Sequence, residues 1–570
     1  MIVVLHNFLD VLMKNFGNKL VEILSPLLLG VLAFFIIIGP RVLYPTNIAW
    51  LGGGDPATHY LGWLFFRNSE WSFPIGLNPT YGLELGSAIL FTDSNPLLAF
   101  LFKPFASLLP EPFQYSGIWL LACFVLQAWF GWKLAGLLSE STPIRVFSTG
   151  LFVFAPPMMW RLPVHLSLGG HFFILAALYL ALHPRLERRR LVWASLLATT
   201  ALVHAYLLAM VALLWLADLV GKSIQRKLPI RTGAVELVVI LSVIGIVCWQ
   251  VGYFSVGEGT SKFGFGYYRM NLLSIVDASG WSYVLNDIPE SPGDYEGFNF
   301  LGLGVLFLIV RAVPVALTGN TGLLETIRKF PVLLVALAGF VVFAISNHVA
   351  FADHALAYPL PDTMLVFASV FRSSGRMFWP VFYAIIFVVI FLIVRGSNTR
   401  IAVYLLGFAL IIQLVDTSAA WKGIREKLMM EPNTTWVTPM VDPFWEKAGT
   451  QYKKVRWIPP GNQSPQWLPL AAYAGTHGLA TDAVYLARVG TLALKQAQRM
   501  ASDALESGRY EADSLYILDE SSFRQAAGSV DSTTDVLARV DGFNILAPGW
   551  KKCTDCPHLA DEAKFTDLVP

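Results

Sequence analysis

Long apolar runs separated by short polar segments dominate the chain. The runs lie near residues 22–39, 116–137, 146–160, 166–183, 191–220, 233–252, 299–317, 331–346, 377–395 and 401–419. Because a helix needs about 20 apolar residues to cross the hydrocarbon core of a bilayer, these runs predict transmembrane helices. No small-residue cleavage site follows the first run, so we expect an uncleaved span there. Residues 1–20 place Lys14 and Lys19 opposite an apolar face, which predicts a separate cytoplasmic interfacial helix.

Basic clusters between the runs predict the orientation of the spans. They comprise Arg185, Arg188, Arg189, Arg190, Lys222, Arg226, Lys227, Arg231, Arg328, Lys329, Arg395 and Arg400, and such clusters favour the cytoplasmic side. Since they flank both ends of the 191–220 run, this run should cross twice, as two short helices that turn near His204. For the same reason the segment 96–110, with Lys103 and three prolines, should not cross. The count becomes about eleven spans, with the N-terminus in the cytoplasm.

The remaining polar sequence divides the chain into two expected domains. Residues 40–115, 253–298 and 347–376 form long external loops of a transmembrane domain over 1–420. The last 150 residues hold 34 Asp, Glu, Lys and Arg residues, against 46 in the first 420, which predicts a periplasmic domain over 421–570. Strand-like KVRWI (453–457) and SLYIL (514–518), helical patterns near 465–475 and 491–507, and a strand-rich end from DVLARV to ILAPG indicate a small α/β fold.

Composition supports a membrane protein and excludes several classes. The mean hydropathy is +0.56 and only 14% of the residues are charged, against roughly 25% in soluble domains. This excludes a soluble enzyme and a disordered or fibrous chain. The net charge of +2 is too small to indicate nucleic-acid binding. Cys553 and Cys556 form a lone C-x-x-C, which cannot supply a four-cysteine zinc site and should be a disulfide in an oxidising periplasm.

The first external loop contains the strongest catalytic candidate, Asp55, in WLGGGDPATHYLGWLFFRN (50–68). Three glycines precede it, and Pro56 suits the first position of a helix that places His59 one turn away. Asp55 is then either a helix N-cap or a general base whose pKa partial desolvation would raise. Further candidate substrate-binding side chains in this loop are His59, Tyr60, Arg67, Glu84 and Asp93; for Glu84 and Asp93, loop stabilisation is the alternative.

Basic residues near the external surface are candidate phosphate ligands. Arg372 and Arg376 are spaced to share one helix face in FRSSGRMFWP (371–380), and paired guanidiniums suit phosphate, although arginines at helix ends also reach lipid headgroups. Arg269 is a second phosphate ligand or a loop anchor, and His204 a phosphate partner or a core histidine. The aromatic-rich loop 253–298 adds Lys262, Tyr268 and Glu296 as candidate substrate contacts; it would equally suit packing on the bilayer surface.

The stretches GGGDPATHYLGWLFFR, FTDSNPLLAFLFKPF, DYEGFNFLGLG and FRSSGRMFWP, with the expected topology, resemble an uncharacterised bacterial branch of the GT-C superfamily of membrane glycosyltransferases. This resemblance covers about the first 420 residues. It implies inverting transfer of a sugar from a polyprenyl-phosphate donor at the periplasmic face of the bacterial inner membrane, with Asp55 as the base. Many members carry two acids in tandem there, whereas Gly54 precedes Asp55, so a divalent metal is left open, with Asp93 as a second carboxylate.

The acceptor would be a periplasmic glycan, lipid or protein, and arabinofuranosyl transfer is one option by looser resemblance. Arg372, Arg376 and Arg269 would stabilise the leaving phosphate, and membrane lipids would surround the spans. Two other functions stay open: a flippase or exporter of lipid-linked sugars, and a non-catalytic scaffold for cell-envelope assembly. A flippase would need a polar path, for which the spans offer Gln127, His171, His204 and Gln413.

The orientation can be tested with single reactive cysteines in intact cells. We expect cysteines placed near Ala205, Gly280 and Gly475 to react with a membrane-impermeant reagent from the periplasm, because all three lie on the predicted external side. A cysteine near Arg189 should react only after the membrane is permeabilised. Reaction at Gly475 only after permeabilisation would contradict the predicted orientation.

Overall fold

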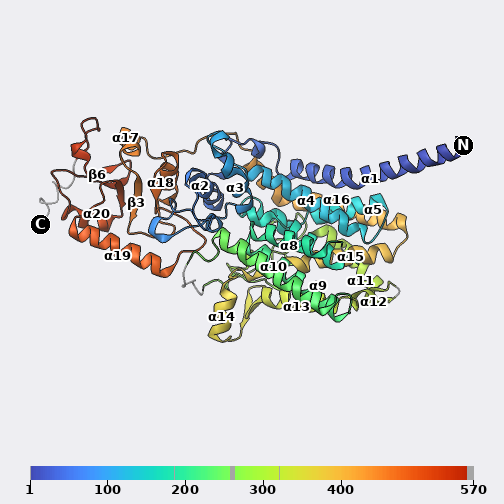
Figure 1. Cartoon of the computed structure of the whole chain (residues 1–570). Helices are drawn as coiled ribbons and strands as arrows, with labels where there is room; N and C mark the ends of the chain where they lie inside the picture. The colour runs from blue at the N-terminus through green and yellow to red at the C-terminus, as the bar shows by residue number, and fades with distance from the viewer. Residues whose placement is uncertain (1, 185–186, 257–262, 320, 561–570) are drawn as a thin grey trace. The chain divides into compact units, whose positions relative to one another are not determined.

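The computed structural model describes residues 2–184, 187–256, 263–319 and 321–560, with side chains from residue 20 onward. The chain forms two compact units. The helical unit comprises Met1–Trp50, Tyr115–Ile244 and Lys262–Pro432, and the mixed unit comprises Leu51–Gln114, Gly245–Ser261 and Asn433–Pro570. Figure 1 labels their elements. Each unit is described by itself.

The helical unit is built from helices that match the apolar runs. They are α1 (Ile2–Ile37), α4 (Ser116–Gly136), α5 (Thr142–Val153), α7 (Phe172–Leu182), α8 (Arg189–Ala201), α9 (Ala205–Ile224), α10 (Ile230–Val251, whose end belongs to the mixed unit), α11 (Leu303–Leu317), α13 (Pro331–Ile345), α15 (Trp379–Arg395) and α16 (Thr399–Leu428). Within the described residues, six helical segments are long and apolar enough to cross a membrane: Leu20–Ile37, Ser116–Gly136, Ala205–Ile224, Ile230–Val251, Ser374–Arg395 and Thr399–Leu428. The others are shorter. These six segments indicate a multi-pass membrane protein.

The prediction that the 191–220 run forms two helices is confirmed, whereas the number of times this run and the 96–110 segment cross the membrane stays a prediction. The 191–220 run forms two helices, α8 and α9, and the His204 side chain accepts a hydrogen bond from the Tyr206 N–H (3.1 Å) as the N-cap of α9. Residues 96–110 form only α3 (Pro96–Phe102) and a 3-10 segment, η5 (Lys103–Leu108). Residues 2–20 form the first part of α1, which continues without a break into the first candidate span and contains Pro26; that this part lies at the membrane surface stays a prediction.

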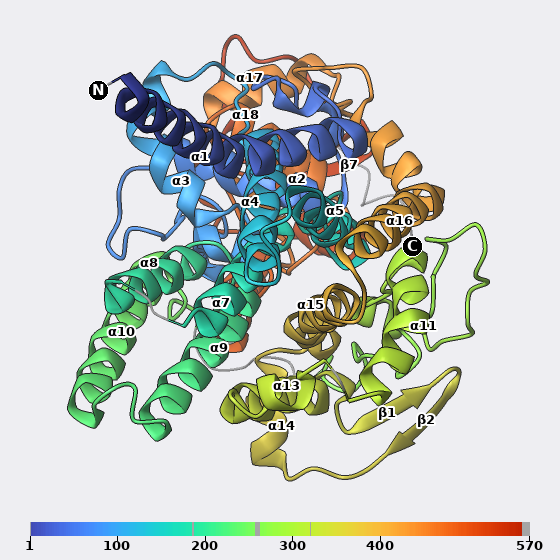
Figure 2. The same ribbon diagram turned by 90° about the vertical axis from the view of Figure 1, so that its right-hand side faces the viewer.

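Small residues let the helices of this unit pack closely, as the end-on view in Figure 2 shows for α1, α4 and α5. A Cβ added at Gly30 in α1 would lie 2.6 Å from the Cα of Val125 in α4. A Cβ at Gly117, at the start of α4, would lie 1.8 Å from the carbonyl oxygen of Val42. Real Cβ atoms do not approach other atoms so closely, so α4 can occupy its place only because both positions are glycine.

Polar side chains inside the helical unit bond to one another and to the backbone. Gln413 of α16 donates to the carbonyl oxygens of Leu301 (3.1 Å) and Phe154 (3.3 Å), and its own oxygen accepts from the Gly304 N–H (3.1 Å) at the start of α11. The Gln127 amide lies 3.0 Å from the Tyr383 hydroxyl, which lies 2.8 Å from Nδ1 of His171. These contacts tie α4, α7, α11, α15 and α16 together.

The mixed unit confirms the α/β pattern predicted for the C-terminal region. Its elements are α17 (Pro443–Gln451), β3 (Lys454–Ile458), α18 (Trp467–Thr476), β4 (Ala480–Thr481), α19 (Thr491–Ser507), β5 (Ser514–Leu518), α20 (Glu520–Ala527), β6 (Val536–Val540) and β7 (Phe543–Ala547). The strand order is β4-β3-β5-β7-β6. β3 pairs in parallel with β4 and β5, whereas β7 runs antiparallel to β5 and β6. Cys553 and Cys556 form a disulfide, as predicted.

Residues 51–114 of the first loop belong to this mixed unit and not to the helical unit. The domain boundary expected at residue 420 had placed this loop in the transmembrane domain. The loop carries α2 (Gly54–Asn68), η3 (Leu83–Leu85) and η4 (Ile89–Thr92). The Gly82 N–H donates to the carbonyl oxygen of Thr481 at 2.7 Å, and Arg456 of β3 binds both oxygens of Glu84 at 3.0 and 2.9 Å. Partners this far apart in the chain leave no local pattern, so the sequence does not reveal the association.

Candidate functional site

A buried carboxylate, Glu296, binds two buried guanidiniums in the helical unit. Nε and Nη2 of Arg376 each donate to one Glu296 oxygen at 2.8 Å. Nη1 of Arg161 lies 2.8 Å from Glu296 Oε2, and its Nη2 donates to the Glu296 carbonyl oxygen at 2.9 Å. Nε2 of His165 lies 3.8 Å from Glu296 Oε1 and 3.4 Å from Arg376 Nη2. We call these four side chains the arginine cluster.

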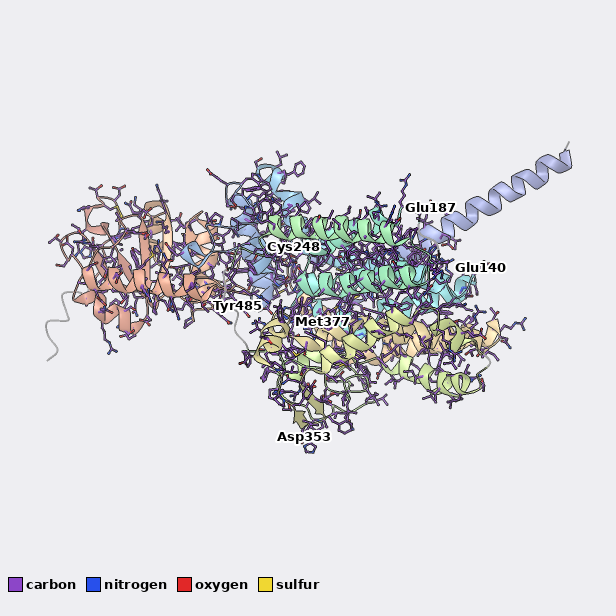
Figure 3. All side chains as sticks on the ribbon, turned by 60° about the horizontal axis from the view of Figure 1, so that its bottom comes forward. Glu140, Glu187, Cys248, Asp353, Met377 and Tyr485 are labelled. Atoms are coloured by element: carbon purple, nitrogen blue, oxygen red, sulfur yellow. A yellow bond between two sulfur atoms is a disulfide. The ribbon has the colours of Figure 1, made fainter. Side chains whose placement is uncertain are left out.

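Short helical turns carry three members of the arginine cluster, and the turn that holds Arg376 opens the candidate span Ser374–Arg395. Arg161 ends α6 (Pro156–Arg161), Glu296 lies in η7 (Asp294–Gly297), and Arg376 lies in η8 (Ser374–Phe378). Figure 3 shows Met377 of η8 toward one end of the helical unit and Glu140 and Glu187 at the other.

Two glycines allow η7 and η8 to meet. A Cβ added at Gly375 would lie 2.5 Å from the Cα of Gly297, and a Cβ at Gly297 would lie 2.2 Å from the Arg269 carbonyl oxygen. The Gly375 N–H also donates to the carbonyl oxygen of Tyr268 at 3.1 Å. The glycines in DYEGFNF and FRSSGRMFWP therefore let Glu296 reach Arg376.

Aromatic rings support both guanidiniums. The Arg376 guanidinium lies 5.1 Å from the centre of the Tyr206 ring, and that of Arg161 lies 5.6 Å from the Trp379 ring. Contacts of this kind favour arginine over lysine. The Tyr206 hydroxyl accepts from the Ser373 N–H at 2.8 Å. His204 caps the helix that carries Tyr206. His204 therefore supports the arginine cluster through the position of Tyr206.

The charges of the arginine cluster do not cancel. Burial acts to raise the pKa of the Glu296 carboxyl, but Arg161 and Arg376 outweigh burial and hold this pKa well below its ordinary range. Burial lowers the pKa of Arg161 to about 10, so Arg161 stays charged at neutral pH. Burial is also the main cause that lowers the pKa of His165, which is therefore neutral. The four side chains carry two positive charges and one negative charge, a net charge that suits a monoanion.

The other basic candidates lie in different environments. Arg372 is exposed and Arg376 is buried, and residue 373 is not helical, so the prediction that both share one helix face is wrong. Residues 372 and 373 lie before η8 and outside any helix, so the two arginines do not have helical spacing. Nε of Arg269 pairs with Oδ1 of Asp294 at 3.0 Å, beside the arginine cluster, as a loop anchor would. Lys262 lies outside the described residues.

In the mixed unit, Asp55 stands in the first turn of α2 and is not its N-cap. The helix begins at Gly54 after Gly53, and these residues have φ values of 56° and 139°. Glycine adopts such backbone angles at little cost, so the chain enters the helix two residues earlier than an N-cap at Asp55 would require. Nε2 of His59 lies 3.6 Å from Oδ2 of Asp93, which itself has a φ of 53°. An acid and an imidazole are therefore held together near the first turn of α2.

The remaining first-loop candidates make contacts within the mixed unit. Arg67 donates to the carbonyl oxygens of Ala106 (2.9 Å), Leu109 (3.4 Å) and Pro110 (3.1 Å), and so closes the end of the 96–110 segment. Tyr60 packs edge-to-face on Trp436 with ring centres 5.3 Å apart. Glu84 binds Arg456. Among the described residues, no three His, Cys, Asp or Glu side chains form a group that could hold a metal ion.

Arg161 and His165 are members of the arginine cluster that sequence reasoning missed. They lie in RLPVH (161–165), directly after the apolar run 146–160. The predicted topology places Arg161 at the external end of a span. Arg376 was chosen as a candidate for the same reason. Applied to every span, this signal would have found Arg161, whereas nothing in the sequence distinguishes His165.

A family model described as a domain of unknown function (DUF6311) matches residues 27–418, and the model of the DUF6311 C-terminal domain matches residues 444–548. The chain belongs to the DUF6311 family. The first match contains the whole arginine cluster together with Asp55, and the second contains the five-stranded sheet of the mixed unit. No curated protein matches this DUF6311 chain.

The glycine contact can be tested with Gly375→Ala. A methyl group at this position would force η7 and η8 apart, and overpacking of this kind costs about 1–3 kcal/mol. We expect the variant to unfold at a lower temperature than the wild type in detergent. The control is Gly339→Ala in α13, where an added Cβ meets nothing within 4 Å and alanine favours the helix by about 0.5–1 kcal/mol. Equal transitions for the two variants would contradict the packing argument.

Proposed function

We propose that this DUF6311 protein is an inverting glycosyltransferase that moves a sugar from a polyprenyl-phosphate donor to a periplasmic acceptor. It would act at the outer face of the bacterial inner membrane, with the mixed unit in the periplasm. The observation that carries the proposal is the arginine cluster, in which Arg161 and Arg376 are buried beside a single carboxylate. The resemblance of the sequence motifs to the GT-C superfamily supports the same reaction.

The net charge of the arginine cluster suits the leaving group of this reaction. The donor is a phosphodiester with one negative charge, and cleavage of the sugar–oxygen bond yields a phosphate monoester, which approaches two negative charges because its second pKa is about 6. Negative charge therefore develops on the phosphate in the transition state. Fixed guanidiniums in a site that excludes water stabilise such charge more than they stabilise the ground state. Arg161 and Arg376 would supply this stabilisation, and the exposed Arg372 would attract the donor headgroup.

The proposed base is Asp55. It would accept the proton of an acceptor hydroxyl as the oxygen attacks the anomeric carbon, so that the sugar inverts while polyprenyl phosphate leaves. Asp55 is half-buried and follows two glycines whose missing side chains leave the backbone accessible. The His59–Asp93 pair is the next candidate. The acceptor is a glycan, lipid or protein, with arabinofuranosyl transfer as one option. A divalent metal would require ligands from the donor or solvent.

Transport of a lipid-linked sugar is less well supported. Three of the polar residues that could line a path, Gln127, His171 and Gln413, bond within the helical unit, and Gln413 caps the start of α11. A scaffold without catalysis would give no role to the net positive charge of the arginine cluster.

The base can be tested with Asp55→Asn in liposomes that contain a synthetic polyprenyl-phosphate sugar. Asparagine keeps the size and the hydrogen-bonding oxygen of the side chain but cannot accept the proton. We expect release of polyprenyl phosphate to fall by a factor on the order of 100 to 10,000, the usual contribution of a positioned base. The control is Asp503→Asn, at an exposed position on α19, which should release polyprenyl phosphate at the wild-type rate.

Two outcomes would count against this assignment. Near wild-type release by Asp55→Asn would exclude Asp55 and make Asp93 and Glu84 the next acids to test. If the wild-type protein moves the intact donor across the bilayer and releases no polyprenyl phosphate, it is a transporter.

The phosphate ligands can be tested separately with Arg376→Lys. Lysine keeps the charge but loses the planar fork that binds Glu296 and a phosphate oxygen together. We expect the donor concentration for half-maximal rate to rise, with a smaller change in the acceptor dependence. Arg372→Ala, which removes an exposed side chain, should raise the donor requirement without changing the unfolding temperature. An unchanged donor dependence in both variants would show that these arginines serve stability or lipid contact alone.

A further inference from the structure

A nearly uncharged segment of the helical unit exposes its apolar side chains between two spans. It contains the hairpin of β1 (His348–Phe351) and β2 (His354–Ala357), followed by α14 (Asp362–Ser369). The exposed apolar side chains are Phe351, Leu356, Tyr358, Met364, Val366, Phe367 and Val370. Phe367 is 79% exposed and Leu356 is 73% exposed. Water-soluble surfaces rarely present so many apolar side chains together, so the segment requires a partner.

The composition of the segment indicates what this partner is. Residues 355–371 read ALAYPLPDTMLVFASVF, in which Asp362 is the only charged residue. An interface with another protein normally carries a polar rim and hydrogen-bonding side chains around its apolar centre. This stretch has almost none, whereas polar or charged side chains stand just beyond it: Asp353 in the hairpin turn, His354 at the start of β2, and Arg372. An apolar surface that ends in charges is typical of a segment lying in a bilayer.

The neighbouring spans continue the same kind of surface. The segment follows α13, which exposes Val335 and Val342, and it leads through η8 into α15. Figure 2 shows α14, β1 and β2 together at the edge of the helical unit beside α13. Figure 3 shows Asp353 at the projecting end of the hairpin. The lipid that surrounds the apolar surface of α13 would therefore also contact the apolar surface of the segment.

We propose that residues 355–371 insert into the interfacial layer of the membrane, with lipid acyl chains as the partner of their apolar side chains. The depth is limited by the backbone. Among the described residues, β1 and β2 form a two-stranded sheet, so the outer edge of β2 has no strand beside it and needs water or headgroups for its polar groups. Pro359 and Pro361, which lack an N–H, reduce the number of donors between the hairpin and α14. This inference is independent of sugar transfer.

Spin labels on the full-length protein in phosphatidylcholine–phosphatidylglycerol liposomes test the insertion. Labels would be placed at Leu356→Cys and Phe367→Cys, after Cys123 and Cys248 are replaced by alanine and with the Cys553–Cys556 disulfide kept. The matched control is Leu492→Cys on α19, because Leu492 is also 73% exposed. Collisions with oxygen, which concentrates in hydrocarbon, are compared with collisions with a water-soluble nickel chelate.

We expect the ratio of oxygen to nickel collisions to be severalfold higher at Leu356→Cys and Phe367→Cys than at Leu492→Cys. Equal ratios at all three positions would place the segment in water and overturn the proposal. Low collision rates with both reagents, together with spin–spin broadening between labelled copies, would identify a second copy as the partner and would also overturn it. Both labelled positions are exposed, so a folding defect in one variant leaves the other to decide.

Discussion

Two backbone segments approach each other at Gly297 and Gly375 more closely than side-chain-bearing residues would permit, and the arrangement of charge at the end of the helical unit depends on this contact. It brings η7 against η8, and with them Glu296 against Arg376. Burying an ion without its partner costs several kcal/mol, so the positions of Arg161 and Arg376 are stable only while Glu296 stays between them. The aromatic rings of Tyr206 and Trp379 then complete the surroundings of two cations that water hardly reaches. Sterics at two glycines thus determine the electrostatics of the site.

Much of the helical unit follows from hydrophobic period and basic clusters alone. The division of the 191–220 run at His204 and the short helix at 96–102 were both predictable, because charge at the ends of a run restricts how often it can cross. Helical spacing was misleading at Arg372 and Arg376, because the helix that holds Arg376 begins only at Ser374. The N-cap alternative placed Asp55 two positions earlier relative to its helix than the structure does, because the positive φ angles of Gly53 and Gly54 have no signature beyond glycine itself. Arg161 pairs with Glu296, which lies 135 residues further along the chain. A single sequence does not reveal a contact between residues so far apart.

The C-terminal region behaves differently, since its strands and helices follow their local patterns closely. β3 and β5 correspond to KVRWI and SLYIL, and α19 begins and ends as its apolar period predicts. The sequence does not show which segments of the chain belong to this unit. In the first loop, Glu84 contacts Arg456 and Tyr81 pairs with Thr481. No local sequence pattern marks these contacts, because the partners meet only in the folded structure.

The joining of the first loop to the last domain has a consequence for biosynthesis. The loop leaves the ribosome early, whereas Arg456 and Thr481 are made only after α16, the last of the long apolar helices, has been translated. Until then Glu84 lacks its guanidinium partner and the backbone near Gly82 lacks its strand. A nascent chain would carry an incomplete unit through most of its insertion, and the final stretch of translation would complete a fold begun about 370 residues earlier. A chain truncated before Arg456 would therefore leave Glu84 without this partner and disturb the first loop as well as the segment removed.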